Sequence, residues 1–483
     1  MTAEPDSRAT VPTEQTTHGY RRTLNAGHVT LMVVAAAAPL SSMIGNVPGG
    51  LLLGNGAGLP VTFLMAGVVM ALLSVVYVAL NRAFPAAGGF AGFVTAGLGR
   101  GAGVGTAYAT MLCYASATIA YAVGVGYFGS LIAASHGVDI PWWLLTAVAV
   151  LVSATLGRRA ADLSGKTLVV VLLAEFLLLV ILDALILVQK GGGAFPLESF
   201  TPGAILSGNI GPALMVGFTS LIGIESGILY THEVRNPGRS IPRATYWAIA
   251  LVTLFYVLTC WMIIGGLGAS DTVAAAEQYQ GDVVFVLAAQ TGGPALLVPM
   301  QIFFCASVLA SMIAMHNATS RYLFTLAKDG YLPRPLGVLH HAQRVPRRAS
   351  DLLVAVATLL LTVLAVSGVD PYIGISTSLV GFLTVGLFGV QIVVAVAAIV
   401  HFRRSTDPQR SRIIAAAAAG GLCVTLVVGI MAANYSVLTG SDSAWANLPP
   451  VLLLVALLAG PIVVRRRARA SVSDLRGTGP APA

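Results

Sequence analysis

Apolar residues fill most of this chain in twelve long runs, which short polar segments separate. A membrane-spanning helix needs about 20 mostly apolar residues, and each run approaches or exceeds that length. The runs predict twelve transmembrane helices, at residues 28–53, 59–80, 104–134, 141–157, 165–189, 204–231, 245–268, 283–312, 351–368, 372–402, 412–435 and 446–464. Several runs are longer than one straight span requires, which indicates a tilted or a broken helix.

Charge fixes an orientation for these helices. Only 10% of the residues are charged, against about 25% in soluble domains, so most of the chain cannot face water. Lysine and arginine favour cytoplasmic loops. With the N-terminus inside, the alternation places all of the 27 basic residues except Lys190 in cytoplasmic segments. A missed or extra helix would scramble this pattern. We therefore expect a multi-pass protein of the cell (plasma or inner) membrane, with both termini cytoplasmic and no binding of nucleic acid.

The two ends of the chain are polar. Residues 1–23 predict a disordered cytoplasmic tail, because no short apolar stretch with a cleavage site follows Arg21 and Arg22, as a secretory signal would require. Residues 467–483 predict a second cytoplasmic tail. The four cysteines lie inside apolar runs without paired spacing, which favours packing over a metal site or a disulfide framework.

Two of the apolar runs are interrupted at membrane depth. The first contains Pro39, Ser41, Ser42, Gly45 and Pro48, and the sixth gathers Gly217, Thr219, Ser220, Gly223 and Gly227 around Glu225. Non-helical backbone at that depth must line a cavity or lie buried in protein, although each run alone also fits a kinked packing helix. Matched interruptions in two halves indicate the binding site of an inverted-repeat transporter, where opened helix N-termini offer amide groups to a carboxylate.

Three stretches carry a resemblance to a known family. They are FPAAGGFAGFVTAGLG (84–99), GFTSLIGIESGILYTHEVRNPGRSIPRA (217–244) and SMIAMHNATSRYLFTLAKDGYLPRPLGVLHHAQRVPRRA (311–349). They are similar to the second-helix exit, the sixth helix with its loop, and the eighth-helix exit of the amino acid–polyamine–organocation (APC) superfamily of permeases. Together with the number of runs, the resemblance covers nearly the whole chain.

The resemblance implies an all-α, LeuT-like fold: a five-plus-five inverted repeat with broken helices 1 and 6, and two added C-terminal helices. It places the first repeat at 24–190, the second at 203–402 and the added helices at 410–466. Substrate is then expected between helices 1, 3, 6, 8 and 10. The chain departs from the family pattern at Pro39-Leu40-Ser41-Ser42, where glycines are usual, and at Leu221, where an aromatic residue is common.

Three acids lie within the apolar runs. Glu225 is costly in a bilayer, by about 3 kcal/mol on insertion scales, and we interpret it as a proton carrier; the alternative is a buried acid bonded to an opposed helix. Glu175, near the middle of the fifth run, is the second proton-coupling candidate, or attracts a cationic amine. Pairing of Glu175 with a hydroxyl of the first or eighth run fits equally well. Asp183 is expected to be solvated or structural.

The remaining site candidates follow from the resemblance. It implies that backbone groups in the two breaks hold the substrate, at Pro39, Ser41, Ser42 and Met43 in the first and at Thr219, Ser220, Leu221 and Gly223 in the sixth. Tyr114, two helical turns before Tyr121, either caps the pocket or packs. Ser307 and Ser311 share a helix face and offer hydroxyls to a cation, unless each bonds its own helix backbone. We predict no metal site and no cofactor.

Together these features favour a secondary active transporter that moves an amino acid or small organic amine by alternating access, coupled to protons. No ATP-handling motif is present, so an ion or exchange gradient must drive it. The alternatives are an amino acid/polyamine exchanger and a non-transporting membrane sensor on the same scaffold. An enzyme is disfavoured, because the runs hold no nucleophile–base pair or metal-ligand spacing. The expected partners are the substrate, protons and the lipid bilayer, and the oligomeric state is left open.

Overall fold

The structure is a computed structural model that describes residues 24–85, 89–158, 165–340, 345–441, 443 and 447–477. The expected N-terminal tail at 1–23 lies outside the described residues, as does 478–483 of the C-terminal tail. Residues 86–88 and 341–344, within two of the stretches that carry the resemblance, also lie outside them.

The described residues form helices and no β-strand, apart from one isolated bridge between Leu24 and Val234. The helices of the first half are α1 (Ala26–Ala36), α2 (Pro39–Ser41), η1 (Ser42–Asn46), α3 (Val47–Leu53), η2 (Gly56–Gly58), α4 (Pro60–Ala83), α5 (Phe90–Leu98), α6 (Arg100–Ser135), α7 (Trp142–Gly157), α8 (Gly165–Lys190), η3 (Gly191–Ala194) and η4 (Leu197–Phe200). Those of the second half are α9 (Pro202–Ile205), α10 (Ile210–Thr219), η5 (Ile224–His232), α11 (Pro237–Leu267), α12 (Thr272–Tyr279), η6 (Gln280–Asp282), α13 (Val283–Lys328), η7 (Arg334–Gly337), α14 (Arg347–Val366), η8 (Pro371–Thr377), α15 (Ser378–Arg403), α16 (Arg410–Ala433), α17 (Tyr435–Thr439) and α18 (Pro449–Gly477).

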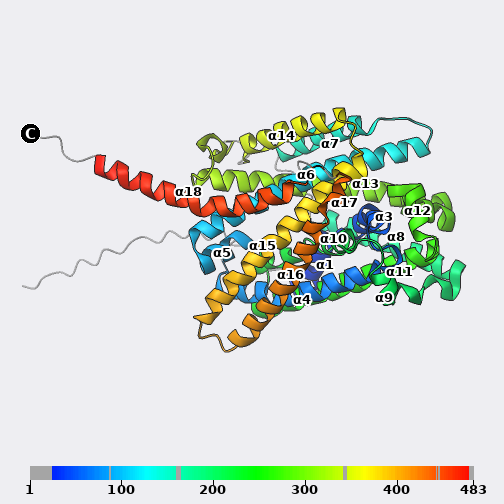
Figure 1. Cartoon of the computed structure of the whole chain (residues 1–483), viewed down its shortest axis with the longest axis horizontal. Helices are drawn as coiled ribbons and strands as arrows, with labels where there is room; N and C mark the ends of the chain where they lie inside the picture. Colours follow the sequence, from blue (N-terminus) through cyan, green and yellow to red (C-terminus); the bar gives the residue numbers. More distant parts are fainter. Residues whose placement is uncertain are drawn as a thin grey trace, which may run out of the picture.

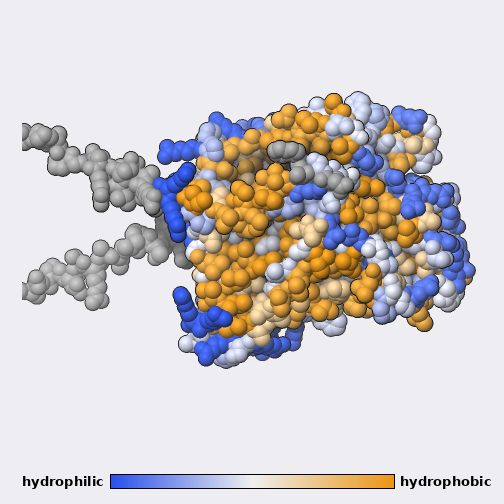
Figure 2. Space-filling model, viewed as in Figure 1, coloured by the Kyte–Doolittle hydropathy of each residue, from blue (hydrophilic) through white to orange (hydrophobic). Residues whose placement is uncertain are grey.

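The long helices run roughly side by side along the length of the molecule (Figure 1). Among the described residues, eleven helical segments are long and apolar enough to cross a membrane, and the shorter apolar α7 matches the remaining predicted run. Figure 2 shows the consequence at the surface: a broad hydrophobic belt lies between two hydrophilic ends. The predicted all-α membrane fold is confirmed, whereas the count of twelve spans stays a prediction.

The first predicted helix break is confirmed between α1 and α3. Ala38 has φ +44°, a left-handed conformation that only the surrounding packing can hold for a residue with a Cβ. Pro39 then starts α2, and η1 follows as a π-helical turn. Because Leu40 lies in the first turn of α2, its amide has no acceptor within the helix and is available to another group.

The second predicted break is confirmed between α10 and η5. The helix ends at Thr219, and Gly223 adopts φ +106° before the 3₁₀ segment η5 begins. A Cβ on Gly223 would lie 2.8 Å from the Ala36 carbonyl oxygen. The two breaks therefore pack directly against each other, and only a residue without a side chain fits at their contact.

Two irregularities were not predicted from the sequence. The eighth run is expected to be one helix, but α13 is kinked at Gly293, whose φ is +61°. The tenth run begins with the π-helical η8, where the Asp370 carboxylate accepts hydrogen bonds from the amides of Tyr372 and Ile373. Both features adjust the start of a long span without interrupting its apolar pattern, so hydropathy alone does not reveal them.

A seam of glycines joins α6 to α18, the span with the smallest buried share among those described. A Cβ on Gly105 would overlap the Leu457 carbonyl oxygen, and one on Gly460 would overlap the Gly105 amide nitrogen. Small residues at such positions let the backbones of two membrane helices approach closely.

We expect Gly105→Ala to lower the thermal stability of the detergent-solubilised protein, because the added methyl group must push α18 away. Overpacking of this kind costs about 1–3 kcal/mol, more than the gain of about 1 kcal/mol in helix propensity. Thermal unfolding followed by circular dichroism measures the change. Gly429→Ala is the matched control, since Gly429 lies in α16 with no neighbouring atom within 4 Å. A Gly105→Ala midpoint at or above the control's contradicts this packing argument.

Candidate functional site

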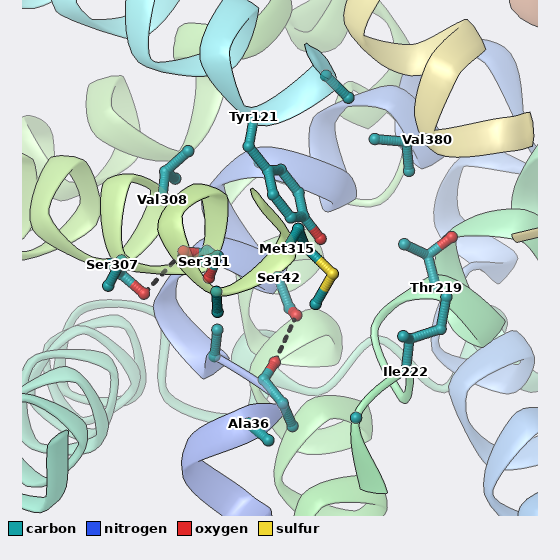
Figure 3. Close-up of a pocket in the computed structure, with 18 of the residues that line it drawn as sticks. Ala36, Ser42, Tyr121, Thr219, Ile222, Ser307, Val308, Ser311, Met315 and Val380 are labelled. Atoms are coloured by element: carbon teal, nitrogen blue, oxygen red, sulfur yellow. Dashed lines mark hydrogen bonds between the residues drawn. The ribbon is translucent and has the colours of Figure 1, made fainter. Parts of the chain in front are cut away.

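A cavity of about 580 Å³ lies where the two helix breaks meet. Its walls come from α1 to α3, from α5, α6, α8, α10 and η5, and from α13, η8 and the start of α15. Figure 3 shows Ser42, Thr219 and Ile222 from the two breaks facing Tyr121 of α6 and Ser311 and Met315 of α13 across this space. The expected position between helices 1, 3, 6, 8 and 10 matches these walls, and α8 adds a wall that the expectation did not include.

Glu175 is the acid on the α8 side of the cavity. The residue is only 3% exposed, and its Oε2 accepts a hydrogen bond from the Leu40 amide at 3.3 Å. This amide is the one that the first helix break leaves without a helical acceptor. The Ser307 hydroxyl lies close enough to interact with the carboxyl. Pairing with a hydroxyl of the first or eighth run, the alternative that the sequence left open, thus stays a prediction, and the hydrogen-bond partner that the structure shows is a backbone amide of the first break.

Two serines extend this contact across the cavity. The Ser41 hydroxyl donates to the Ser307 hydroxyl at 2.9 Å, which links α2 to α13. Ser311, one turn further along α13, also lines the cavity. Among the described residues no group of three or more His, Cys, Asp or Glu side chains has the arrangement of a metal site. The oxygens of Glu175, Ser41 and Ser307 thus form a small polar cluster around one carboxyl group.

Glu225 is the acid on the other side of the cavity. It sits at the start of η5, partly exposed to the cavity. Its Oε2 accepts a hydrogen bond from the Gly223 amide at 2.9 Å. Tyr77 and Tyr114 lie close enough to interact with its charge. The hydrogen bond between Glu225 and Gly223 is local, and it stabilises the second break.

The predicted substrate residues separate into two groups. Ser41, Ser42, Thr219, Gly223 and Tyr114 line the cavity. Pro39, Met43, Ser220 and Leu221 are buried beside it and do not line it. Some lining hydroxyls already have protein partners: Ser42 donates to the Ala37 carbonyl at 3.1 Å, and Thr219 pairs with Thr384. Tyr114 packs edge-to-face against Tyr322 while facing the cavity.

Sequence reasoning missed several lining residues. Asn46 ends η1, and its amide donates to the Ser220 hydroxyl at 3.3 Å, so it joins the two breaks. Arg321, exposed near the end of α13, also lines the cavity and shows that the cavity reaches the surface at that end. The sequence did offer a signal for Asn46, because its polar side chain follows Gly45 in a predicted helix break. No pattern indicated that Arg321 faces inward.

Aromatic rings close the other end of the cavity. Phe128 packs edge-to-face on Phe304, with ring centroids 4.7 Å apart, and Tyr127 stacks on Tyr372 at 5.0 Å. The Tyr372 hydroxyl donates to the Gly45 carbonyl at 3.1 Å, which joins η8 to the first break. The cavity is thus open at the end where Arg321 lies and closed by aromatic rings at the end near η6.

The chain is similar to known proteins along most of its length. Residues 27–458 match the family model described as amino acid permease. An uncharacterized transporter of Rhizobium meliloti is 29% identical over 51% of this chain, which spans about half (53%) of that relative's length. An L-asparagine permease of Streptomyces coelicolor is 23% identical over 74% of this chain and 73% of its own. A methylthioribose transporter of Bacillus subtilis is 24% identical over 83% of this chain and 86% of its own.

A solved structure shares the fold at low sequence identity. A mutant of the manganese transporter of Eremococcus coleocola superposes with a TM-score of 0.55 at 15% identity, covering 94% of this chain and 97% of its own. The complex of that transporter with an aromatic bis-isothiourea compound gives 0.57 at 14% identity, over 93% and 99%. This likeness concerns the fold alone, and it confirms the expected LeuT-like arrangement of helices.

Proposed function

The chain belongs to the amino acid permease family, and on that premise we propose that it is a secondary active transporter for an amino acid or a small organic amine. The observation that carries the proposal is the cavity between the two helix breaks, with Glu175 on one wall and Glu225 on another. Alternating access, with one end of the cavity sealed while the other is open, is the working cycle of transporters with this architecture.

The chemistry of the cavity supports a ligand that carries an amine. Broken helices expose backbone amides that bind a carboxylate and carbonyls that accept from an ammonium group. Two carboxyl groups line the cavity, and opposite charge attracts a cationic amine into a space that water leaves on closure. An amino acid uses both kinds of group, whereas an amine without a carboxylate uses mainly the acids.

We further propose that protons drive transport through Glu175 and Glu225. A buried carboxylate without a cationic partner is costly in the membrane. The cavity therefore closes more readily when Glu175 and Glu225 are protonated and neutral. A carboxyl group that binds a proton on the acidic side of the membrane releases this proton on the alkaline side. Substrate that moves with it is therefore accumulated on the alkaline side.

Uptake into liposomes tests the function. The purified protein is reconstituted and offered labelled L-asparagine, glutamate, serine, putrescine and ethanolamine, with the outside acidified. We expect accumulation of at least one compound, and none in protein-free liposomes. Equal uptake after a protonophore collapses the gradient would favour the exchanger, which preloading with the same compound then tests. Uptake of no compound on a broader panel of amino acids and amines, by protein that still unfolds cooperatively, would favour the sensor.

Glu175→Gln separates two roles of that acid. Gln keeps an acceptor oxygen for the Leu40 amide and a group for Ser307 but carries no charge. If Glu175 attracts amines, the loss in apparent affinity is larger for putrescine than for serine, by about tenfold per 1.4 kcal/mol of lost interaction. Competition uptake measures both compounds in one preparation. Glu277→Gln, at an exposed position of α12, is the control. Equal losses for both compounds would rule out the amine-attracting role.

A further inference from the structure

Asp183 is a second buried acid on α8, eight residues beyond Glu175 and outside the residues that line the cavity. The residue is 6% exposed, and Leu179 and Ile186, on the same face of α8, are fully buried, as is the adjacent Leu182. A solvated position, one of the two interpretations of the sequence, is therefore wrong. The remaining question is what a carboxyl group does in this apolar contact between α8 and α11.

The hydrogen bonding of Asp183 is incomplete. The Thr259 hydroxyl of α11 donates to its Oδ2 at 2.8 Å, while Oδ1 is buried and has no hydrogen-bond partner within the described part of the chain. A carboxylate in such a place normally has a cation or several donors around it. One oxygen of this carboxyl group thus remains available to a proton.

No cation from the packed elements faces Asp183 in the described structure. α11 presents Tyr256 and Cys260, and α13 carries Cys305, all of which are neutral near pH 7 in their ordinary state. The C-terminal end of α8 lies beside the part of α13 around Thr291, because the Gln189 side-chain amide donates to the Thr291 carbonyl at 2.9 Å. The charged residues of α13 begin far along the helix, beyond Ser307. α1 contributes only the exposed His28, and α2 and η3 contribute no titratable group. On α8 itself the charged neighbours are Glu175 and the exposed Lys190.

Two hydroxyl groups of α11 lie near the two acids of α8. Tyr256 and Thr259 lie three residues apart on α11, so they share one face of that helix, and both are fully buried. Tyr256 interacts electrostatically with Glu175 and donates its hydroxyl to the Ala37 carbonyl in the first break at 2.8 Å. α11 thus brings one hydroxyl close to Glu175 and a second into a hydrogen bond with Asp183.

We propose that Asp183 is a second proton-binding site, which takes up and releases its proton in step with Glu175. The Thr259 hydroxyl already donates to Oδ2, so a proton on the partnerless Oδ1 neutralises the carboxylate without a cation. Asp183 lies on the Lys190 side of Glu175 along α8. This inference rests on the proposed proton coupling.

Proton binding at Asp183 is tested directly by infrared difference spectroscopy of the purified protein during a pH titration, with the proton as the only probe. The C=O stretch of a neutral carboxyl group is resolved from that of a carboxylate. We expect Asp183→Asn to remove one titrating carboxyl band. The Asn side chain keeps an acceptor for Thr259, so the contact between α8 and α11 is preserved. Thr259→Val keeps the acid and removes its donor, and the same band is expected to remain with a shifted midpoint.

A merely structural role of Asp183 predicts a different pair of results for these two variants. In that case Thr259→Val destabilises the protein, Asp183→Asn is tolerated, and the titrating bands of Asp183→Asn and the wild type superimpose. That superposition would overturn the proposal. If Asp183→Asn does not fold, an unshifted carboxyl spectrum in folded Thr259→Val overturns it instead.

A transport measurement separates this inference from the proposed function. A pH-sensitive dye trapped in the liposomes reports proton entry when the transported panel compound is added. We expect Asp183→Asn to reduce proton entry at least about tenfold while counterflow of the same compound at equal pH continues. Proton entry at the wild-type rate would overturn the role of Asp183. If the wild type itself admits no protons with substrate, the proton coupling fails, and the infrared result still decides whether Asp183 binds a proton.

Discussion

Glu225→Gln is expected to abolish the acid stimulation of uptake and to reduce uptake driven by a pH gradient at least about tenfold, equivalent to about 1.4 kcal/mol in the transport barrier. The reason is chemical. Gln keeps an oxygen that accepts the Gly223 amide hydrogen bond of 2.9 Å, so the second break keeps its shape. It cannot take up or release a proton, and the step that couples release to opening of the cavity is lost.

The measurement is initial uptake into liposomes as a function of external pH, with thermal-shift binding of the same compound to the purified variant. Binding should remain measurable, because the cavity walls are unchanged. Glu198→Gln is the matched control, since Glu198 is exposed in η4 and remote from the cavity lining. A Glu225→Gln pH profile that coincides with the wild type would exclude Glu225 as a proton carrier and leave Glu175 as the candidate.

Gly223→Ala is expected to impair both stability and transport. The backbone at Gly223 has φ +106°, a conformation that costs a residue with a Cβ about 1–2 kcal/mol. The new Cβ would also lie 2.8 Å from the Ala36 carbonyl oxygen, and that clash is with backbone, which cannot rotate away. Overpacking adds about 1–3 kcal/mol. We therefore expect a lower midpoint of thermal unfolding and uptake reduced at least about tenfold.

Gly440→Ala separates these two effects. Gly440 also has a left-handed backbone, with φ +60°, but no atom lies within 4 Å of its ideal Cβ position. This control therefore carries the backbone strain without the clash and should lose less stability than Gly223→Ala, with uptake retained. Equal losses in the two variants would show that the contact between the breaks is unimportant. Wild-type behaviour of Gly223→Ala would contradict the tight packing of the breaks.

Much of the fold was predictable because the membrane constrains the sequence strongly. Length and hydropathy define the spans, and the clusters of proline, glycine and serine at Pro39 and Gly223 marked both breaks, since such residues are unfavourable in a continuous apolar helix. The kink at Gly293 and the π-helical start at Pro371 escaped prediction. Each lies near the end of a span, where loss of the helical pattern also fits an ordinary helix terminus.

The site was less predictable, because it depends on which faces of the helices meet. α8 is apolar almost all round, so the sequence marked Glu175 as a candidate from its depth alone and did not reveal that Asp183 is buried against Thr259. The contact of Glu175 with the Leu40 amide joins residues far apart in the chain and arises only once helix 1 has broken. Predicted substrate residues such as Met43 and Leu221 lie one layer behind the cavity wall. A shift of one residue around a helix axis decides such an assignment.

The hydrogen bond from Tyr372 to Gly45 ties the aromatic closure to the same backbone that lines the cavity. A ligand that competes for the Gly45 carbonyl therefore changes the free energy of opening at the sealed end. Thermodynamic linkage makes this effect reciprocal: opening must change the affinity for that ligand by the same factor. The protein would then hold its ligand with unequal strength on the two sides of the membrane, so half-saturation would differ between the sides, while the direction of net transport is still set by the gradients.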